Sequence, residues 1–265
     1  MKYKLMAVDI DGTLLDSQNV LRDETVTAIR LGVEKGLLFT IATGRPIQGV
    51  EQYNKRLSLD LPYITYNGAM VVMGESKEIL YEQCLSFEDA KNIWALGLSC
   101  GTTIIVWSKN NLYVSALDGR AKKYGELART PPVLMDDLEA VLKAGATKML
   151  WYDEAENIAR FETELAGRLG EGVNFHTSKP IFLEFVDRKA SKAIAMQKLG
   201  EHFGISREEM IAIGDGDNDL SMIEYAGLGI AMSNAKDSVK KRADYITLSN
   251  DEHGVAHAIY EFVLK

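Results

Sequence analysis

The sequence predicts an α/β protein in which a parallel-sheet core is interrupted by an inserted α+β domain. Short apolar segments alternate with amphipathic ones near both ends of the chain, as in β-α-β units. Between them, strand-like segments separated by turns replace that alternation. At roughly 150 residues per domain, 265 residues suffice for about two domains. We therefore expect a Rossmann-like core over 1–84 and 188–265, with residues 85–187 as the insert.

Buried strands and connecting helices make up the N-terminal part of the predicted core. Residues 5–8 form a short apolar run, and residues 37–42 and 63–66 form two more. Apolar residues at helical spacing predict a helix over 23–33. Pro46 suits the first turn of another helix. Consecutive strands joined by helices imply right-handed crossovers and a parallel sheet.

The expected insert has strands and helices in mixed order. Strands are predicted over 70–73 and 79–84 just before it, and within it over 102–107, 112–115, 147–152, 173–177 and 181–186, with helices over 86–98 and 154–169. The core pattern resumes at Ser191. It comprises helices over 191–203, 220–225 and 255–263 and strands over 210–213, 228–232 and 245–247.

Charge and composition exclude several classes of function. Acidic residues number 38 and basic residues 30, so the net charge of −8 argues against a general nucleic-acid binder. No segment approaches the roughly 18 apolar residues of a membrane span. Cys84 and Cys100 form neither a disulfide framework nor a zinc pattern. We expect a cytoplasmic protein with no membrane partner.

Polar loops follow three of the predicted core strands. Residues 9–13 come after the first strand, residues 43–45 after the second, and residues 214–219 after the strand over 210–213. In an open parallel sheet, ligands bind beyond the carboxyl ends of the strands. We therefore expect these three loops to meet and to form the functional site.

The carboxylates of two of these loops favour a metal site. Asp9 and Asp11 lie two residues apart at a strand end, so both can project toward the same side, and Gly12 permits a sharp turn beside them. Asp215 and Asp219 bring further negative charge from another strand. Neighbouring carboxylates repel one another and tend to share a proton or a cation. Oxygen ligands without cysteine or histidine indicate a hard ion, and we expect Mg²⁺ serving a phosphate-bearing substrate.

Other residues of the site can hold a phosphoryl group. Thr43 supplies a hydroxyl, and the backbone amides near Gly44 open a helix, where anions bind. Lys192 supplies a positive charge where the core pattern resumes. Arg45 and Asn67 can line the pocket as substrate-binding residues, although a turn role explains Asn67 equally well.

Two other interpretations of the acidic loops fail on their spacing. A calcium-binding loop needs glutamate at its twelfth position, where the first loop has Val20 and the second has Ala226. A dinucleotide fingerprint needs a third glycine where Asp219 stands. Taken singly, each loop is more simply a solvated turn, and Lys192 a surface lysine. Only the joint position of the three loops, each directly after a core strand, indicates a functional site.

With these motifs the chain resembles the haloacid dehalogenase (HAD) superfamily, specifically its Cof-type phosphatases with a large inserted cap. The resemblance covers nearly the whole chain. It rests on Asp9-Ile10-Asp11-Gly12-Thr13-Leu14, Ala42-Thr43-Gly44-Arg45, Asn67-Gly68-Ala69, Lys192, Gly214-Asp215-Gly216-Asp217-Asn218-Asp219, Gly229-Ile230-Ala231-Met232, Asn234-Ala235, Asp244 and Gly254-Val255-Ala256.

The resemblance implies a role for each candidate residue. Asp9 would be the nucleophile that forms an aspartyl-phosphate, and Asp11 would protonate the leaving oxygen and later activate water. Mg²⁺ would be bound by Asp9, the backbone carbonyl of Asp11 and Asp215, with Asp219 in support. The inserted cap would exclude water and select the substrate. The phosphate-binding candidates are Gly12, Thr43, Gly44, Lys192 and Asn218.

The sequence departs from the family's pattern at a few positions. Proline and glycine are frequent shortly before the lysine, but residues 187–191 contain neither, and Ala193 stands where glycine commonly follows. Lys189 therefore competes weakly with Lys192 for the same role. His253 stands where an acidic residue is usual. None of these positions touches the nucleophile.

We expect a Mg²⁺-dependent phosphatase whose partner is a small phosphorylated metabolite, such as a sugar phosphate or a phosphorylated cofactor. A phosphomutase of the same superfamily would use similar machinery but return the phosphoryl group to its substrate. A phospho-accepting switch module would also combine an acidic pocket with threonine and lysine, but such modules are about half this size. The sequence names neither the substrate nor the oligomeric state.

Overall fold

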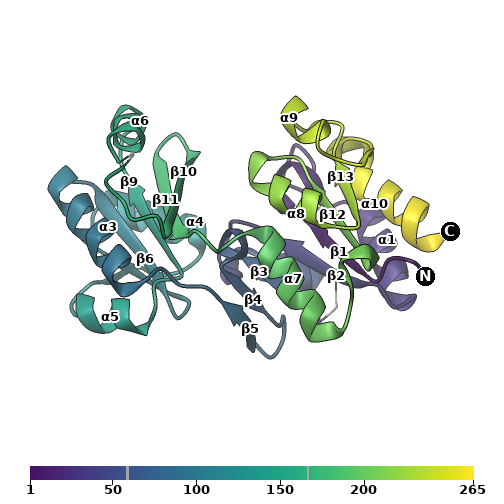
Figure 1. The fold of residues 1–265 in the computed structure, drawn as a ribbon, viewed down its shortest axis with the longest axis horizontal. Coiled ribbons are helices and arrows are strands. Elements are labelled where there is room, and N and C mark those ends of the chain that lie inside the picture. The colour runs from purple at the N-terminus through teal and green to yellow at the C-terminus, as the bar shows by residue number, and fades with distance from the viewer. Residues whose placement is uncertain (58–59, 166) are drawn as a thin grey trace. The chain divides into compact units, whose positions relative to one another are not determined.

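The protein folds into two compact units. The computed structural model describes residues 1–57, 60–165 and 167–265. The first unit comprises Met1–Tyr81 and Ser191–Lys265, and the second comprises Glu82–Ala190 (Figure 1). The second unit thus begins and ends slightly outside the 85–187 predicted for the insert.

An eight-stranded sheet forms the centre of the first unit, in the order β14-β13-β12-β1-β2-β3-β4-β5. Neighbouring strands from β14 to β3 are parallel, and β4 runs antiparallel to β3. The strands are β1 (Leu5–Val8), β2 (Leu38–Ala42), β3 (Tyr63–Thr65), β4 (Met70–Val72), β5 (Ile79–Glu82), β12 (Met210–Gly214), β13 (Leu228–Ala231) and β14 (Tyr245–Ile246). This arrangement confirms the predicted fold class.

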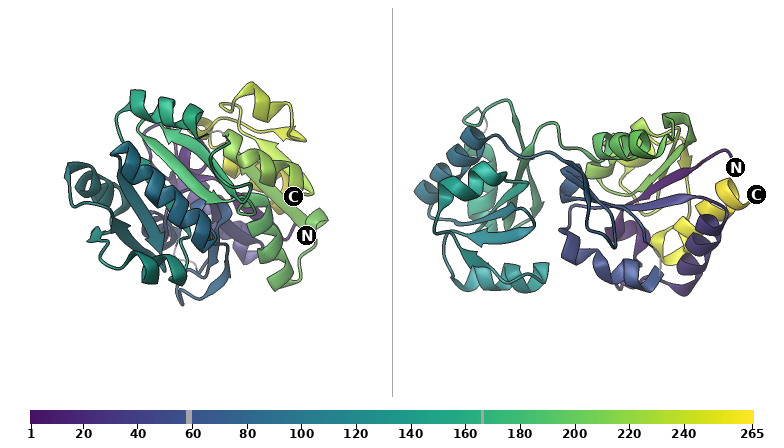
Figure 2. Two further views of the ribbon diagram at one scale, coloured as in Figure 1. Left: turned by 60° about the vertical axis from the view of Figure 1, so that its left-hand side comes forward. Right: turned by 90° about the horizontal axis from the view of Figure 1, so that it is seen from below.

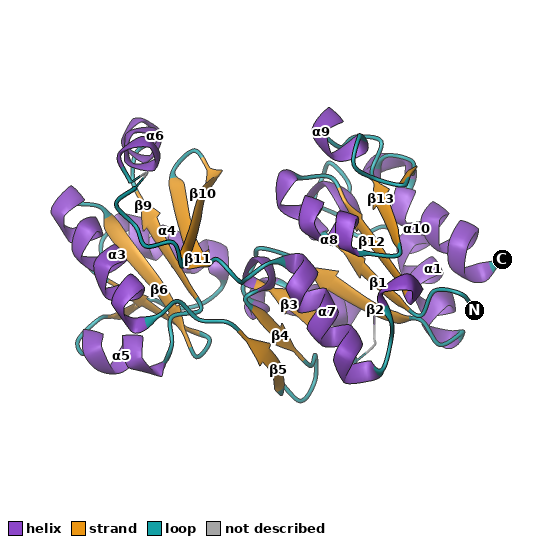
Figure 3. Ribbon diagram, viewed as in Figure 1, coloured by secondary structure: helices purple, strands orange, loops and turns teal. Residues whose placement is uncertain are grey.

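Helices cover both faces of this sheet, as Figure 3 shows. On one face, α7 and α8 pack through Met196, Leu199 and Met222 against Leu5 and its neighbours. On the other face, α1 and α10 lie side by side. The helices of this unit are α1 (Asp23–Glu34), α2 (Glu51–Leu57), α7 (Lys192–Phe203), α8 (Leu220–Tyr225), α9 (Asp237–Lys240) and α10 (Gly254–Ile259). Because both faces are covered, all residues of β1 are buried, which explains its continuous apolar run.

The second unit contains a six-stranded sheet in the order β10-β11-β9-β6-β7-β8, in which only the β7–β8 pair is parallel. Its strands are β6 (Thr103–Ser108), β7 (Asn111–Val114), β8 (Val133–Leu134), β9 (Lys148–Tyr152), β10 (Val173–Lys179) and β11 (Phe182–Asp187). Its helices are α3 (Phe87–Cys100), α4 (Gly119–Ala128), α5 (Leu138–Ala144) and α6 (Ala155–Glu164).

Three of these helices differ from the sequence prediction. Helix α6 ends at Glu164, whereas the predicted helix ran to residue 169. Helices α4 and α5 were not predicted. Each begins at a capping aspartate, Asp118 or Asp137, whose side chain accepts a hydrogen bond from a backbone N–H of the first turn. Both are short. Helix α4 is polar overall and buries mainly the small residues Ala121, Gly125 and Ala128, and α5 buries Leu142, so neither presents a long stripe of large apolar side chains.

The two faces of the second sheet differ in character. One face carries an aromatic core in which the ring centroids of Trp151 lie 5.7 Å from Phe161 and 5.0 Å from Phe185. Because side chains alternate along a strand, Lys148 and Glu184 lie on the other face. There they form a buried ion pair with an N–O distance of 3.1 Å.

The two chain termini lie at the same end of the first unit in both views of Figure 2. Lys35 Nζ at the end of α1 donates to the Leu264 carbonyl at 2.8 Å, which ties the last residues to that helix. Among the described residues, no helix is both long enough and apolar enough to cross a membrane.

Candidate active site

Strand β1 delivers Asp9 into a buried position at its carboxyl end. The backbone N–H of Asp9 donates to the Ile213 carbonyl at 3.0 Å, which extends the pairing of β1 with β12 by one residue. The chain then turns sharply at Gly12, whose φ of 84° favours glycine. A Cβ at this position would lie 2.5 Å from Asp215 Oδ2. The loop over 9–13 can therefore lie this close to the loop over 214–219 only because residue 12 is glycine.

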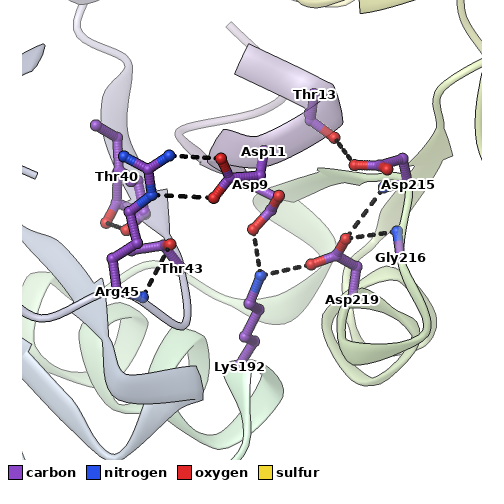
Figure 4. A network of polar contacts seen from close by, with 11 residues as sticks. Asp9, Asp11, Thr13, Thr40, Thr43, Arg45, Lys192, Asp215, Gly216 and Asp219 are labelled. Carbon is purple, nitrogen blue, oxygen red and sulfur yellow. Dashed lines mark hydrogen bonds and ion pairs between the residues drawn. The ribbon is translucent and has the colours of Figure 1, made fainter. Parts of the chain in front are cut away.

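Lys192 lies between two of the aspartates. Its Nζ donates to Asp9 Oδ1 at 2.6 Å and to Asp219 Oδ1 at 2.5 Å (Figure 4). Its side chain is completely buried. Burial by itself would lower the pKa of Lys192, but the two carboxylates raise it above the ordinary value. The lysine that looked like a surface residue in isolation is a charged group inside the site.

Backbone and hydroxyl donors hold the other two carboxylates. Asp219 Oδ2 accepts from the N–H groups of Asp215 and Gly216 at 3.0 and 2.9 Å. Thr13 Oγ1 donates to Asp215 Oδ1 at 2.6 Å. Both oxygens of Asp219 are therefore occupied by donors, whereas Asp215 is held through one oxygen by a hydroxyl group.

The acidic cluster is electrostatically costly without a further cation. Burial, followed by the charge of Asp219, raises the pKa of Asp9 to about 7, although Lys192 opposes this shift. Burial is also the largest cause that raises the pKa of Asp215. One carboxylate oxygen from each of Asp9, Asp215 and Asp219 lies within 4.8 Å of the other two. Three oxygen donors this close, with two of their pKa values raised, fit a hard divalent ion.

The side chain of Asp11 is turned away from this cluster. Its two oxygens accept from Arg45, from Nε at 3.0 Å and from Nη2 at 2.5 Å (Figure 4). Arg45 Nη1 also donates to the Tyr53 hydroxyl at 3.1 Å. Burial alone would lower the pKa of Arg45, but its bonds to Asp11 raise it. The structure thus pairs the candidate acid–base residue with the candidate substrate-binding arginine.

The second loop and Asn67 form one wall of the site. Thr43 Oγ1 accepts from the Arg45 N–H at 3.2 Å, and the Thr43 carbonyl accepts from the Asn67 N–H at 3.0 Å. A Cβ on Gly44 would lie 2.8 Å from Asn67 Oδ1. This Asn67 oxygen is buried and has no hydrogen-bond partner among the described residues. The structure therefore brings Thr43, Gly44, Arg45 and Asn67 together.

The remaining candidates lie at the edge of the site or outside it. Asn218 is exposed on the turn beside Gly216. Lys189 is exposed, and its backbone N–H donates to Asp187 Oδ1 at 2.8 Å. Lys192 rather than Lys189 therefore reaches the aspartates. His253 Nε2 contacts Glu24 Oε2 at 2.8 Å on the α1 side of the unit.

Some residues that support the site were given no role from the sequence. Thr13, which holds Asp215, is one of them. Asn234 Nδ2 donates to the Gly12 carbonyl at 2.8 Å, and Asn250 Nδ2 donates to the Leu15 carbonyl at 2.9 Å. The Asn250 N–H donates to Asn234 Oδ1 at 3.0 Å, so the two asparagines hold the turn after Asp9 together. Spacing could not reveal partners more than 200 residues away.

Known proteins resemble this chain over almost its whole length. A family model described as haloacid dehalogenase-like hydrolase matches residues 6–259. YwtE of Bacillus subtilis, named as a 5-amino-6-(5-phospho-D-ribitylamino)uracil phosphatase, is 32% identical over 280 residues, covering 97% of this chain and 96% of its own. A solved haloacid dehalogenase-like hydrolase from Bacteroides thetaiotaomicron has a TM-score of 0.87 at 35% identity, covering 98% and 99% of the two chains. The HAD subclass IIB sugar phosphatase BT4131 has a TM-score of 0.80 at 29% identity, covering 98% of each chain.

Proposed function

This chain belongs to the haloacid dehalogenase-like hydrolases as a phosphatase, and we propose that it uses Mg²⁺ and an aspartyl-phosphate to hydrolyse small phosphorylated metabolites. The observation that carries the proposal is the buried contact of Lys192 with Asp9, beside Asp215 and Asp219. A nucleophilic carboxylate, a lysine and an oxygen-only donor set in one place suit phosphoryl transfer.

Asp9 and Asp215 are the side chains that would hold the ion, since Asp219 already has donors on both oxygens. Asp219 would then act by fixing Lys192 and the backbone after Asp215. When bound, Mg²⁺ supplies positive charge that favours ionised Asp9 and neutralises phosphoryl oxygens.

The reaction has two displacement steps. In the first, a carboxylate oxygen of Asp9 attacks phosphorus, the bond from phosphorus to the ester oxygen breaks, and Asp11 gives its proton to the departing alkoxide. In the second, Asp11 takes a proton from water as the water oxygen attacks phosphorus, and the bond from phosphorus to Asp9 breaks. Asp9 is restored as a carboxylate, and inorganic phosphate leaves.

The neighbouring groups would stabilise the phosphoryl oxygens during both steps. Lys192 provides charge, Thr43 provides a hydroxyl, and backbone amides near Gly12 and Gly44 provide donors. Asn218, exposed on its turn, would contact the phosphoryl group from the third loop. Gly12, Thr43, Gly44 and Asn218 each follow a core strand, whereas Lys192 begins α7.

Substrate recognition is proposed to fall to Arg45, Asn67 and the second unit. Arg45 can exchange its contact with Asp11 for an anionic or hydroxylated substrate group. Within the part of the chain that the structure describes, Asn67 Oδ1 is an acceptor without a partner. The second unit, Glu82–Ala190, would act as the cap that selects the substrate. The names of YwtE and BT4131 support 5-amino-6-(5-phospho-D-ribitylamino)uracil and sugar phosphates as substrates to test. We propose a cytoplasmic location, because both substrate classes are small metabolites and because Cys84 and Cys100 are free thiols.

The test is Asp9→Asn, assayed for phosphate release from p-nitrophenyl phosphate and a panel of phosphorylated metabolites with Mg²⁺. We expect turnover to fall at least about 1,000-fold, because the amide cannot form the covalent intermediate. Asp217→Asn is the matched control, since Asp217 is an exposed loop aspartate paired with Lys236. Near-normal turnover of Asp9→Asn would exclude covalent catalysis at this residue. Isomerisation without phosphate release would indicate a phosphomutase, and a stable phosphoaspartate without turnover would indicate a switch module.

A further inference from the structure

Three consecutive residues beside the site adopt left-handed backbone conformations. Tyr66, Asn67 and Gly68 have φ angles of 52°, 57° and 94°. Glycine and asparagine tolerate this region, but for a bulky residue such as Tyr66 it is an outlier. Strained backbone persists only where surrounding contacts fix it, and it is concentrated at functional sites.

One side of this turn is tied to the phosphate-binding loop. The Tyr66 N–H donates to the Arg45 carbonyl at 3.1 Å, and the Asn67 N–H donates to the Thr43 carbonyl at 3.0 Å. Two successive amides therefore set the path of the loop that carries Thr43. The loop cannot shift without breaking bonds to the turn.

The other side of the turn lies against the start of α7. A Cβ on Gly68 would lie 2.2 Å from both the carbonyl carbon and the carbonyl oxygen of Ser191, and 2.6 Å from the Lys192 nitrogen. These are backbone atoms, which cannot rotate away as the end of a side chain could. Because Gly68 has no side chain, its backbone can contact the backbone of Ser191 and Lys192 directly.

Ser191 itself caps the start of α7. Its Oγ accepts from the Ile194 N–H at 3.1 Å, as an N-cap. This anchor lies where the chain returns from the second unit, whose last residue is Ala190. Lys192 follows directly, so its position depends on how firmly Ser191 is held.

We propose that Gly68 and Ser191 are positioning residues, which hold the first turn of α7 so that Lys192 stays in register with Asp9 and Thr43. The proposal rests on the proposed phosphatase function. Lys192 contacts Asp9 and Asp219 at 2.6 and 2.5 Å with no exposed side-chain surface, so it has no room to compensate for a displaced backbone. A displacement of about 1 Å can cost about 100-fold in rate.

The first test compares Gly68→Ala with Gly204→Ala. Gly204 ends the same helix at a φ of 66°, and a Cβ there would have no atom within 4 Å. Both variants carry the backbone penalty of alanine at positive φ, but only Gly68→Ala pushes against Lys192. With p-nitrophenyl phosphate and Mg²⁺, we expect kcat of Gly68→Ala to fall about 100-fold and that of Gly204→Ala to stay within about twofold.

Orthovanadate separates a displaced lysine from a merely destabilised protein. Because vanadate imitates the five-coordinate transition state, its inhibition constant should weaken at least about tenfold in Gly68→Ala, while the Mg²⁺ concentration for half-maximal activity stays unchanged. Thermal melting gives the folded fraction used to correct each rate. Equal kcat and vanadate inhibition in the two glycine variants would overturn the role of Gly68.

Ser191→Ala provides a second test of the proposal, which can be used if Gly68→Ala does not fold. Loss of the cap should lower kcat about tenfold and weaken vanadate, and Ser191→Thr should restore both, since it keeps the hydroxyl. Unchanged kcat in Ser191→Ala would overturn the role of Ser191. These outcomes are distinct from failure of the proposed function, in which the wild-type protein would release no phosphate from any phosphomonoester.

Discussion

Arg45 donates to both carboxylate oxygens of Asp11, from Nε at 3.0 Å and from Nη2 at 2.5 Å. The Tyr53 hydroxyl accepts from the same guanidinium, so Arg45 is held at a fixed place beside the site. With both oxygens occupied as acceptors, Asp11 must leave Arg45 before it can donate a proton to a leaving group. In the proposed mechanism, substrate binding therefore has to separate this pair.

The proposed role of Asp11 as an acid predicts that removing its carboxyl group lowers the rate most for substrates with poor leaving groups. Asp11→Asn should lower kcat/KM for an alkyl phosphate such as a sugar phosphate by about 100-fold or more. The loss should be much smaller for p-nitrophenyl phosphate, whose phenolate needs little protonation. Steady-state phosphate release measures both values, and kcat/KM excludes the later hydrolysis of the aspartyl-phosphate. Equal losses for the two substrates would contradict acid catalysis by Asp11.

The position of Asp215 predicts a specific effect on the metal requirement. Thr13 fixes one oxygen of Asp215, and the carboxylate lies within 4.8 Å of Asp9. Asp215→Ala should raise the Mg²⁺ concentration for half-maximal activity at least about tenfold. Asp217→Ala, which removes an exposed carboxylate of the same loop, should leave it unchanged. An unaltered Mg²⁺ titration for Asp215→Ala would remove this residue from the metal site.

The raised pKa of Asp9 predicts that the metal-free protein loses stability as pH rises. Between the ordinary value of 3.8 and about 7, folded Asp9 keeps a proton that unfolded Asp9 has released. Its contribution to stability is complete below 3.8 and is lost as the pH rises through about 7. In EDTA, the melting temperature of the wild type should therefore fall more between pH 5 and pH 8 than that of Asp9→Asn.

Mg²⁺ should reverse this trend, since metal binding requires the ionised carboxylate. The increase in melting temperature on adding MgCl₂ should be larger at pH 8 than at pH 5. It should be strongly reduced in Asp9→Asn at both values. A Mg²⁺ effect independent of pH in the wild type would contradict the shift at Asp9.

The buried pair of Lys148 and Glu184 predicts a strong asymmetry between single and double variants. Lys148→Met removes the ammonium group that faces the buried Glu184 carboxylate, leaving it the Ser178 hydroxyl as a donor, and should lower the free energy of unfolding by about 3–5 kcal/mol. Replacing both residues with apolar ones of similar volume should cost far less. Denaturant unfolding measures both. An additive loss in the double variant would show that the two charges do not stabilise one another.

Acid should weaken the same pair. Burial alone would raise the pKa of Glu184, but Lys148 and His176 lower it below the ordinary 4.5. The contribution of the pair to stability is therefore complete above about pH 4.5 and is lost as the pH falls below that value. The difference in unfolding free energy between the wild type and the double variant should shrink when the pH falls from 6 to 3.

Local sequence determined the fold class and the residues of the acidic cluster. The apolar run before Asp9 has to be buried on both faces, which requires a parallel sheet, and the carboxyl ends of its strands then gather the loops that follow them. Helices α4 and α5 were missed because they are short and bury few large apolar side chains, so they depend on their caps and on tertiary packing.

The tertiary structure alone decided how the site residues are paired. Sequence could not show that Asp11 faces Arg45 while Asp219 faces Lys192, because both carboxylates follow core strands in similar acidic loops. Nor could it show that Gly68 touches Ser191. Propensity and hydrophobic period act over a few residues, whereas ion pairs and backbone contacts depend on the register of strands and helices far apart in the chain.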